Sequence, residues 1–162
     1  MSEAMHASRL LVLGIGSRLM GDDGIGPKLI DALQHEPCPD NWLLCAAETD
    51  INYASGLRLQ GDCIVLVDAA RAGNAPGTVY LVELETKGWG KRPIPSLHES
   101  GAWEMVFQEP HAGGWLIGVE VDEISPGIGL SETLDLTFPE IVVRVKAGLQ
   151  EISRVSHLLL KV

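Results

Sequence analysis

Basic residues are scarce in this 162-residue sequence. Its 12 Lys and Arg residues stand against 22 Asp and Glu residues, which gives a formal charge of −10, and the basic residues form no cluster. Sequence-independent binding to nucleic acid or to an anionic lipid surface requires a basic face. The composition therefore argues against both kinds of partner.

The sequence also lacks a long apolar run. The first apolar stretch, from Leu10 to Ile15, is far shorter than the roughly 20 residues that cross a bilayer. The preceding segment, MSEAMHASR, contains Glu3 and has no apolar core of the kind that a signal peptide carries. We therefore expect a cytoplasmic protein that does not contact a membrane.

Cysteine is rare, with Cys38, Cys45 and Cys63 as the three examples. An odd number without Cys-x-x-Cys spacing indicates neither a disulfide framework nor a zinc knuckle. Cys45 and Cys63 lie within apolar runs, so we expect them to be small buried hydrophobic side chains.

Short apolar runs separated by helical patterns make up most of the chain. The length predicts a single domain over residues 1–162, with residues 1–8 flexible. Alternating strands and helices predict a mainly parallel α/β sheet covered on both faces. The expected strands are 9–15, 41–48, 63–70, 77–84 and 114–121, and the expected helices are 25–36, 51–60, the second half of 96–108, and 139–160 with Pro139 in its first turn.

A glycine-rich loop, LGIGSRLMGDDGIGP, follows the first predicted strand. It is not a dinucleotide fingerprint, because Leu19 occupies the place of the third glycine, and it is not a P-loop, because Asp22 follows Gly21. Adjacent carboxylates at Asp22 and Asp23 would also repel a phosphate. We expect Asp22 to cap the helix that starts near Ile25, which leaves Asp23 for another role.

Carboxylates follow two of the predicted strands. Asp23 comes after the first, and Asp68 ends the strand 63–70, where it is expected to face solvent. Ligands of parallel sheets bind beyond the carboxyl ends of the strands. Such a pair can hold a metal, share a proton or act as a general base. His98 follows the strand 77–84, on the side where we expect the strand exits to gather, and an imidazole favours a transition metal.

Four segments resemble those of the hydrogenase maturation proteases, endopeptidases that trim the C-terminal tail of a nickel–iron (NiFe) hydrogenase large subunit after nickel insertion. The resemblance extends from about Leu10 to Leu159. Its segments are LGIGSRLMGDDGIGP, IVLVDAA followed by NAPGTVYLVE, SLHESG, and GVEVDEISPGIGLSE.

The resemblance implies a three-layer α/β/α sandwich with a five-stranded, mostly parallel mixed sheet, in which 77–84 is the antiparallel strand. It implies Asp23, Asp68 and His98 as metal ligands, with Asp23 and Asp68 also as catalytic candidates. The metal would be the substrate's own nickel, and no organic cofactor is implied. The implied partner is the hydrogenase large-subunit precursor, and the expected protein is a monomer.

The sequence departs from the family pattern in two places. Ser17 and Arg18 replace the Asn and the apolar residue that usually follow the first Gly-x-Gly. The glycine-rich turn expected after the second strand reads AAETDINYASG. This turn lies near the expected cleft.

The expected chemistry is peptide hydrolysis of an aspartyl or a metal-assisted type. Two carboxylates and one imidazole leave a coordination position open for a substrate. The sequence shows neither a Gly-x-Ser-x-Gly elbow nor a Cys/His pair, so we do not expect a covalent acyl-enzyme intermediate. Two alternatives remain at this point: a non-catalytic, nickel-dependent checkpoint protein, and a small-molecule hydrolase on the same scaffold.

Overall fold

The computed structural model describes residues 9–59, 61–84 and 114–159, with the side chains of 157–159 left out of the description. Five strands lie within one or two residues of their expected limits, because each is a short apolar run bounded by glycine, proline or polar residues. The strands are β1 (Leu10–Ile15), β2 (Trp42–Glu48), β3 (Cys63–Ala70), β4 (Val79–Leu84) and β5 (Gly114–Glu120).

The strands form one mixed sheet in the order β2-β1-β3-β5-β4. Four strands are parallel, and β4 at the edge runs antiparallel to β5. The expected reversal of 77–84 is therefore confirmed. One consequence concerns the ends of β4: Leu84 pairs with Gly114, so β4 ends where the parallel strand β5 begins.

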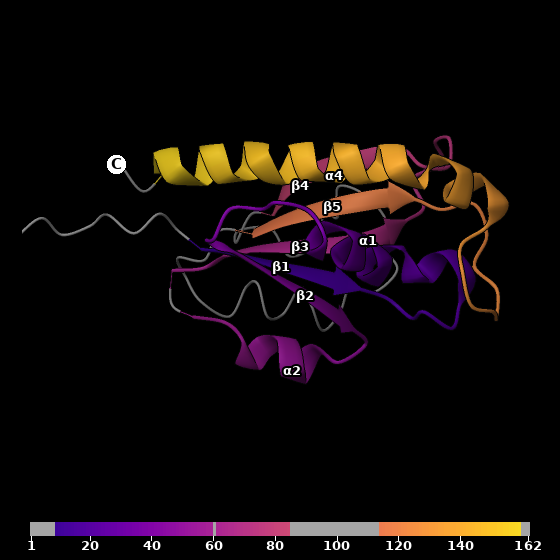
Figure 1. Cartoon of the computed structure of the whole chain (residues 1–162), viewed down its shortest axis with the longest axis horizontal. Helices are drawn as coiled ribbons and strands as arrows, with labels where there is room; N and C mark the ends of the chain where they lie inside the picture. The colour runs from indigo at the N-terminus through magenta and orange to yellow at the C-terminus, as the bar shows by residue number, and fades with distance from the viewer. Residues whose placement is uncertain (1–8, 60, 85–113, 160–162) are drawn as a thin grey trace, which may run out of the picture.

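Helices cover both faces of the sheet, as expected for a three-layer α/β/α sandwich (Figure 1). The described helices are η1 (Gly21–Gly24), α1 (Ile25–Gln34), α2 (Ile51–Gly56) and α4 (Glu132–Leu159). Helices α1 and α4 pack on one face, over a core that includes Val65, Val67 and Val145. Helix α2 lies on the other face, with Ala54 packed among Leu66 and neighbouring apolar residues.

Two helix boundaries differ from the sequence prediction by more than two residues. Helix α4 begins at Glu132, so Pro139 lies inside it rather than in its first turn. The start is set by Ser131, whose Oγ accepts a hydrogen bond from the Leu134 N–H at 3.4 Å. Helix α2 ends at Gly56, four residues earlier than expected. The helix expected in 96–108 lies outside the described residues.

The cysteines behave largely as expected. Cys63 is buried and Cys45 is half-buried, and all three thiols are free. Burial raises the pKa of the Cys63 thiol, which favours its neutral form. Within the residues that the structure describes, no helix combines the length and apolar character needed to cross a membrane.

Candidate functional site

Asp23 lies in the 3₁₀ turn η1, which directly precedes α1. The residue is 5% exposed, and its Oδ2 accepts a hydrogen bond from the Ser17 backbone N–H at 2.9 Å. The turn lies against β3, the neighbour of β1 in the sheet. Asp23 is thereby held at the carboxyl edge of the parallel strands.

The glycines of this loop permit close backbone packing. A Cβ added at Gly16, whose φ is +130°, would lie 2.0 Å from the Asp23 carbonyl oxygen. A Cβ added at Gly26 would lie 2.4 Å from the Val67 carbonyl oxygen and 2.5 Å from that of Ile15. Only residues without a side chain allow the start of α1 to rest directly on the ends of β1 and β3. The glycine-rich segment therefore seats a helix on the sheet.

Asp68 lies in β3, one residue after Val67, the residue that Gly26 contacts. Its Oδ1 accepts a hydrogen bond from the Ala69 N–H at 2.8 Å. Alternation along the strand gives Asp68 the same face as Leu66, which is the α2 face of the sheet. Its partner in β5 is Gly118, which adds no side chain beside it.

The expected solvent exposure of Asp68 is wrong. Asp68 is only 2% exposed, because β3 continues for two residues beyond it alongside β5 and the turn η1 packs against β3. The two carboxylates are nevertheless on adjoining elements at one edge of the sheet. Asp23 and Asp68 are thus both buried acids near the ends of neighbouring strands.

The expected capping role of Asp22 is also wrong. Helix α1 has Gly24 at its N-cap and no side-chain cap. The Asp22 carboxylate is fully buried and accepts hydrogen bonds from the N–H groups of Asp122, Glu123 and Ser131 at 3.0, 2.9 and 2.7 Å. The Ser131 hydroxyl donates a fourth at 2.9 Å. Asp22 therefore fixes the loop between β5 and α4 against η1.

Glu120 is a second buried acid of this kind, and the sequence analysis missed it. Its carboxylate accepts hydrogen bonds from the N–H groups of Ala72, Gly73 and Asn74 at 2.8, 2.7 and 2.9 Å. The Tyr80 hydroxyl donates to it at 3.3 Å. The turn after β3 is thereby fixed, as Asp22 fixes the loop after β5. An acid at the end of an apolar strand was the available signal, although the turn that Glu120 binds lies 46 to 48 residues earlier in the chain.

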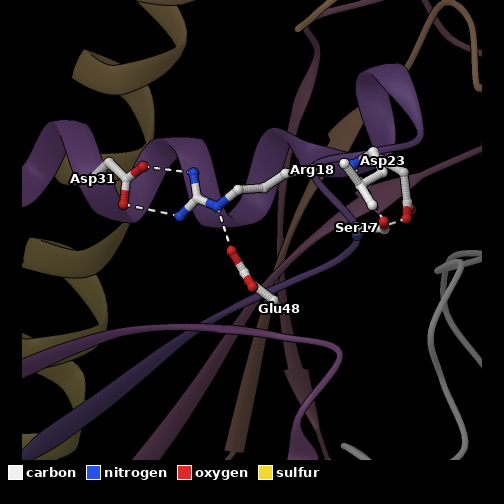
Figure 2. A network of polar contacts seen from close by, with 6 residues as sticks. Ser17, Arg18, Asp23, Asp31 and Glu48 are labelled. Atoms are coloured by element: carbon white, nitrogen blue, oxygen red, sulfur yellow. Dashed lines mark hydrogen bonds and ion pairs between the residues drawn. The ribbon is translucent and has the colours of Figure 1, made fainter. Parts of the chain in front are cut away.

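Arg18, in the first loop, binds residues of two elements, α1 and β2 (Figure 2). Its Nη1 and Nη2 donate to both oxygens of Asp31 in α1, at 2.6 and 3.0 Å. Its Nε donates to the carboxylate of Glu48 at the end of β2. The hydrogen bond to Asp31 raises the pKa of the Arg18 guanidinium, so it stays charged at any relevant pH.

The third expected ligand, His98, lies outside the described residues. One premise about it is corrected: because β4 is antiparallel, the chain leaves Leu84 at the edge opposite Asp23 and Asp68. Across residues 9–59, 61–84 and 114–159, no group of three His, Cys, Asp or Glu side chains is arranged to hold a metal ion. In that part of the chain the site consists of two carboxylates.

Comparison with known proteins gives a consistent result. No protein-family profile matches the sequence. The hydrogenase expression/formation protein HoxM of Azotobacter vinelandii is 32% identical over 127 residues, covering 74% of this chain and 61% of that protein. The hydrogenase 2 maturation protease of Escherichia coli K12 is 28% identical over 162 residues, covering 88% of this chain and 92% of that protein.

The chain thus spans less than two thirds of HoxM and nearly all of the E. coli protease. Among solved structures, the hydrogenase maturating endopeptidase HybD from E. coli superimposes with a TM-score of 0.71 and 27% identity, covering 88% of this chain and 93% of that one. Sequence and fold agree: over most of its length, this chain is similar to hydrogenase maturation proteases.

Proposed function

We propose that this protein is an endopeptidase that removes the C-terminal peptide of a nickel–iron hydrogenase large-subunit precursor after nickel insertion. Two relatives that it spans almost completely are named as a maturation protease and a maturating endopeptidase. The observation that carries the proposal is the packing of η1 on β3, which brings two buried acids, Asp23 and Asp68, to one edge of the sheet. Paired carboxylates of this kind suit metal contact or general base catalysis.

His98 completes the proposed ligand set with Asp23 and Asp68. It lies near the middle of residues 85–113, about 14 residues from Leu84. An extended chain covers roughly 3.3 Å per residue, so this length spans about 45 Å. The seven residues of β5 span roughly 23 Å at the same rise. The chain is therefore long enough to reach the opposite edge of the sheet.

In this proposal the nickel belongs to the substrate. Carboxylate and imidazole ligands fit a divalent transition metal, and three ligands leave positions for groups of the precursor. The protease would recognise nickel that is already seated in its partner. The free protease is then expected to bind nickel weakly, because two carboxylates and one imidazole form an incomplete site.

Two routes to peptide cleavage follow from these residues. In one, Asp23 or Asp68 accepts a proton from the attacking water. In the other, nickel held by the two carboxylates and the imidazole would supply Lewis-acid activation of the scissile carbonyl. Ser17 contributes in both, because its N–H orients the Asp23 carboxylate.

The test uses purified protease with nickel-free and nickel-loaded precursor, incubated in parallel with and without a chelator. Mass spectrometry should detect loss of the C-terminal peptide only from the nickel-loaded precursor. Nickel added to the protease alone should not restore cleavage of the nickel-free form. Equal cleavage of both precursors would refute nickel sensing and leave Asp23 and Asp68 as an acid–base pair.

The alternative function is a checkpoint protein that binds the nickel-loaded precursor without cleaving it. It is motivated by the turn after β2, where Glu48 has a φ of +56° and the family pattern expects glycines. The same incubation separates the two functions. Stable binding with no change in precursor mass would favour the checkpoint.

A further inference from the structure

Arg18 and the turn after β2 are the two places where the sequence departs from the family pattern, and they are bonded to each other. We propose that Arg18 is a positioning residue that bridges α1 and β2, so that the Ser17 N–H holds the Asp23 carboxylate in place. The catalytic meaning of this role rests on the proposed function. The positioning itself can be measured without it.

The guanidinium forms a bridge between two carboxylates on different elements. Its two Nη atoms bind Asp31, in the second turn of α1, and its Nε binds Glu48. The planar, forked shape of Arg allows this pair of contacts, which the single ammonium of Lys cannot reproduce. The loop that carries Arg18 is thus tied at one residue to both α1 and β2.

The Glu48 end of the bridge has an unusual backbone. Glu48 is the one non-glycine residue with a positive φ, +56°, in the described part of the chain. The β1–β2 register shifts beside it, so that Ile15 pairs with Glu48 and Ala47 is passed over. The Glu48 carbonyl accepts a hydrogen bond from the Gly16 N–H at 3.0 Å. The backbone of Glu48 therefore holds Gly16, and its side chain holds Arg18.

The held loop packs directly on the turn that carries Asp23. A Cβ added at Gly24 would lie 3.1 Å from the Arg18 Cα and 3.3 Å from the Ser17 carbonyl oxygen. The Ser17 N–H, on the same loop, donates a hydrogen bond to the Asp23 carboxylate at 2.9 Å. A shift of residues 16–18 would therefore move the hydrogen bond that orients Asp23.

The exposure of the bridge argues against a mainly stabilising role. The side chain of Arg18 is 37% exposed, and those of Asp31 and Glu48 are each 48% exposed. Ion pairs at this exposure add little to stability and are screened by salt. We therefore expect the bridge to fix the position of the loop rather than to raise the free energy of unfolding.

The first measurement is hydrogen exchange at the Ser17 amide, which needs no substrate. Arg18→Ala should accelerate that exchange about tenfold relative to wild type, with a melting temperature within about 4 °C. Arg154→Ala is the control, because Arg154 forms an ion pair with Glu151 on α4 that is more exposed than the bridge of Arg18. Unchanged Ser17 exchange in Arg18→Ala would overturn the proposal.

The second measurement is cleavage of the nickel-loaded precursor. Arg18→Ala should lower kcat on the order of tenfold with KM nearly unchanged, because misplaced catalytic groups slow the reacting step. Arg18→Lys should recover only part of kcat. Glu48→Gly accepts the positive φ without strain but removes one arm of the bridge, so its kcat should also fall while its melting temperature holds.

Salt provides a further distinction at saturating precursor. Rising ionic strength should lower kcat of the wild type and leave that of Arg18→Ala unchanged.

Full activity of Arg18→Lys or of Glu48→Gly would overturn the bridging role. A wild-type protein that cleaves no precursor, while Arg18→Ala still accelerates Ser17 exchange, would refute the proposed function and support the positioning of Asp23.

Discussion

Replacement of Asp22 by Ala should destabilise the protein far more than loss of a helix cap. Three backbone N–H groups lose their acceptor, and the Ser131 hydroxyl loses its partner. Each buried donor left unsatisfied costs about 1–3 kcal/mol. Water can reach part of the exposed loop at Asp122 and Glu123, and removal of a buried charge returns some solvation energy. We therefore expect a net loss of about 3 kcal/mol.

The assay is unfolding by urea and by heat, followed by circular dichroism. For a domain of this size, a loss of 3 kcal/mol lowers the melting temperature by roughly 6–12 °C. The matched control is Asp50→Ala, since Asp50 has the role first expected of Asp22: it caps α2 by accepting from the Tyr53 N–H at 2.9 Å. Loss of that exposed cap should cost about 1 kcal/mol or less.

The comparison can fail in a definite way. If Asp22→Ala and Asp50→Ala lower the free energy of unfolding equally, by 1 kcal/mol or less, the loop between β5 and α4 does not depend on Asp22. Precursor cleavage adds a second readout. Asp22→Ala should also lose activity, because the turn η1 that carries Asp23 is fixed through the same contacts.

Three further predictions concern single buried positions. Asp68→Asn keeps the shape of the side chain, so precursor cleavage should fall about 10³-fold with stability within about 1 kcal/mol, measured by mass spectrometry and urea unfolding. Gly26→Ala should cost roughly 3 kcal/mol, because its Cβ would meet strand carbonyls at 2.4 and 2.5 Å, whereas Gly56→Ala meets nothing within 4 Å and should be nearly neutral. Burial raises the pKa of the Cys63 thiol, so the folded state disfavours the thiolate. The free energy of unfolding should therefore decline as pH rises above 9.0, and this decline should be smaller in Cys63→Ala.

The sheet could be predicted from local sequence because its signals are local. Apolar runs such as Cys63–Ala70 are bounded by turn residues, and the weaker alternation of Val79–Leu84 indicates an edge strand. The positions of Asp23 and Asp68 near strand ends could be predicted for the same reason. Their burial could not, because it depends on neighbouring strands and on a turn packed from another part of the chain.

The roles of Asp22 and Arg18 could not be predicted from the neighbouring sequence. The partners of Asp22 lie about 100 residues further along the chain, so the nearby helix start at Ile25 was the only visible candidate. Arg18 reaches Asp31 and Glu48 on two different elements, and no periodicity relates these three residues. In α4, the helical spacing was correctly read, but the N-cap at Ser131 was overlooked in favour of Pro139.

The reversal of β4 gives the chain a natural insertion point. Leu84 and Gly114 are paired neighbours, so the segment between them begins and ends at one place on the sheet. The entropy of closing such a loop grows only slowly with its length. Related chains can therefore lengthen, shorten or exchange this segment without disturbing the five strands. Changes in the length of this segment can therefore accumulate while the buried acids on η1 and β3 stay where they are.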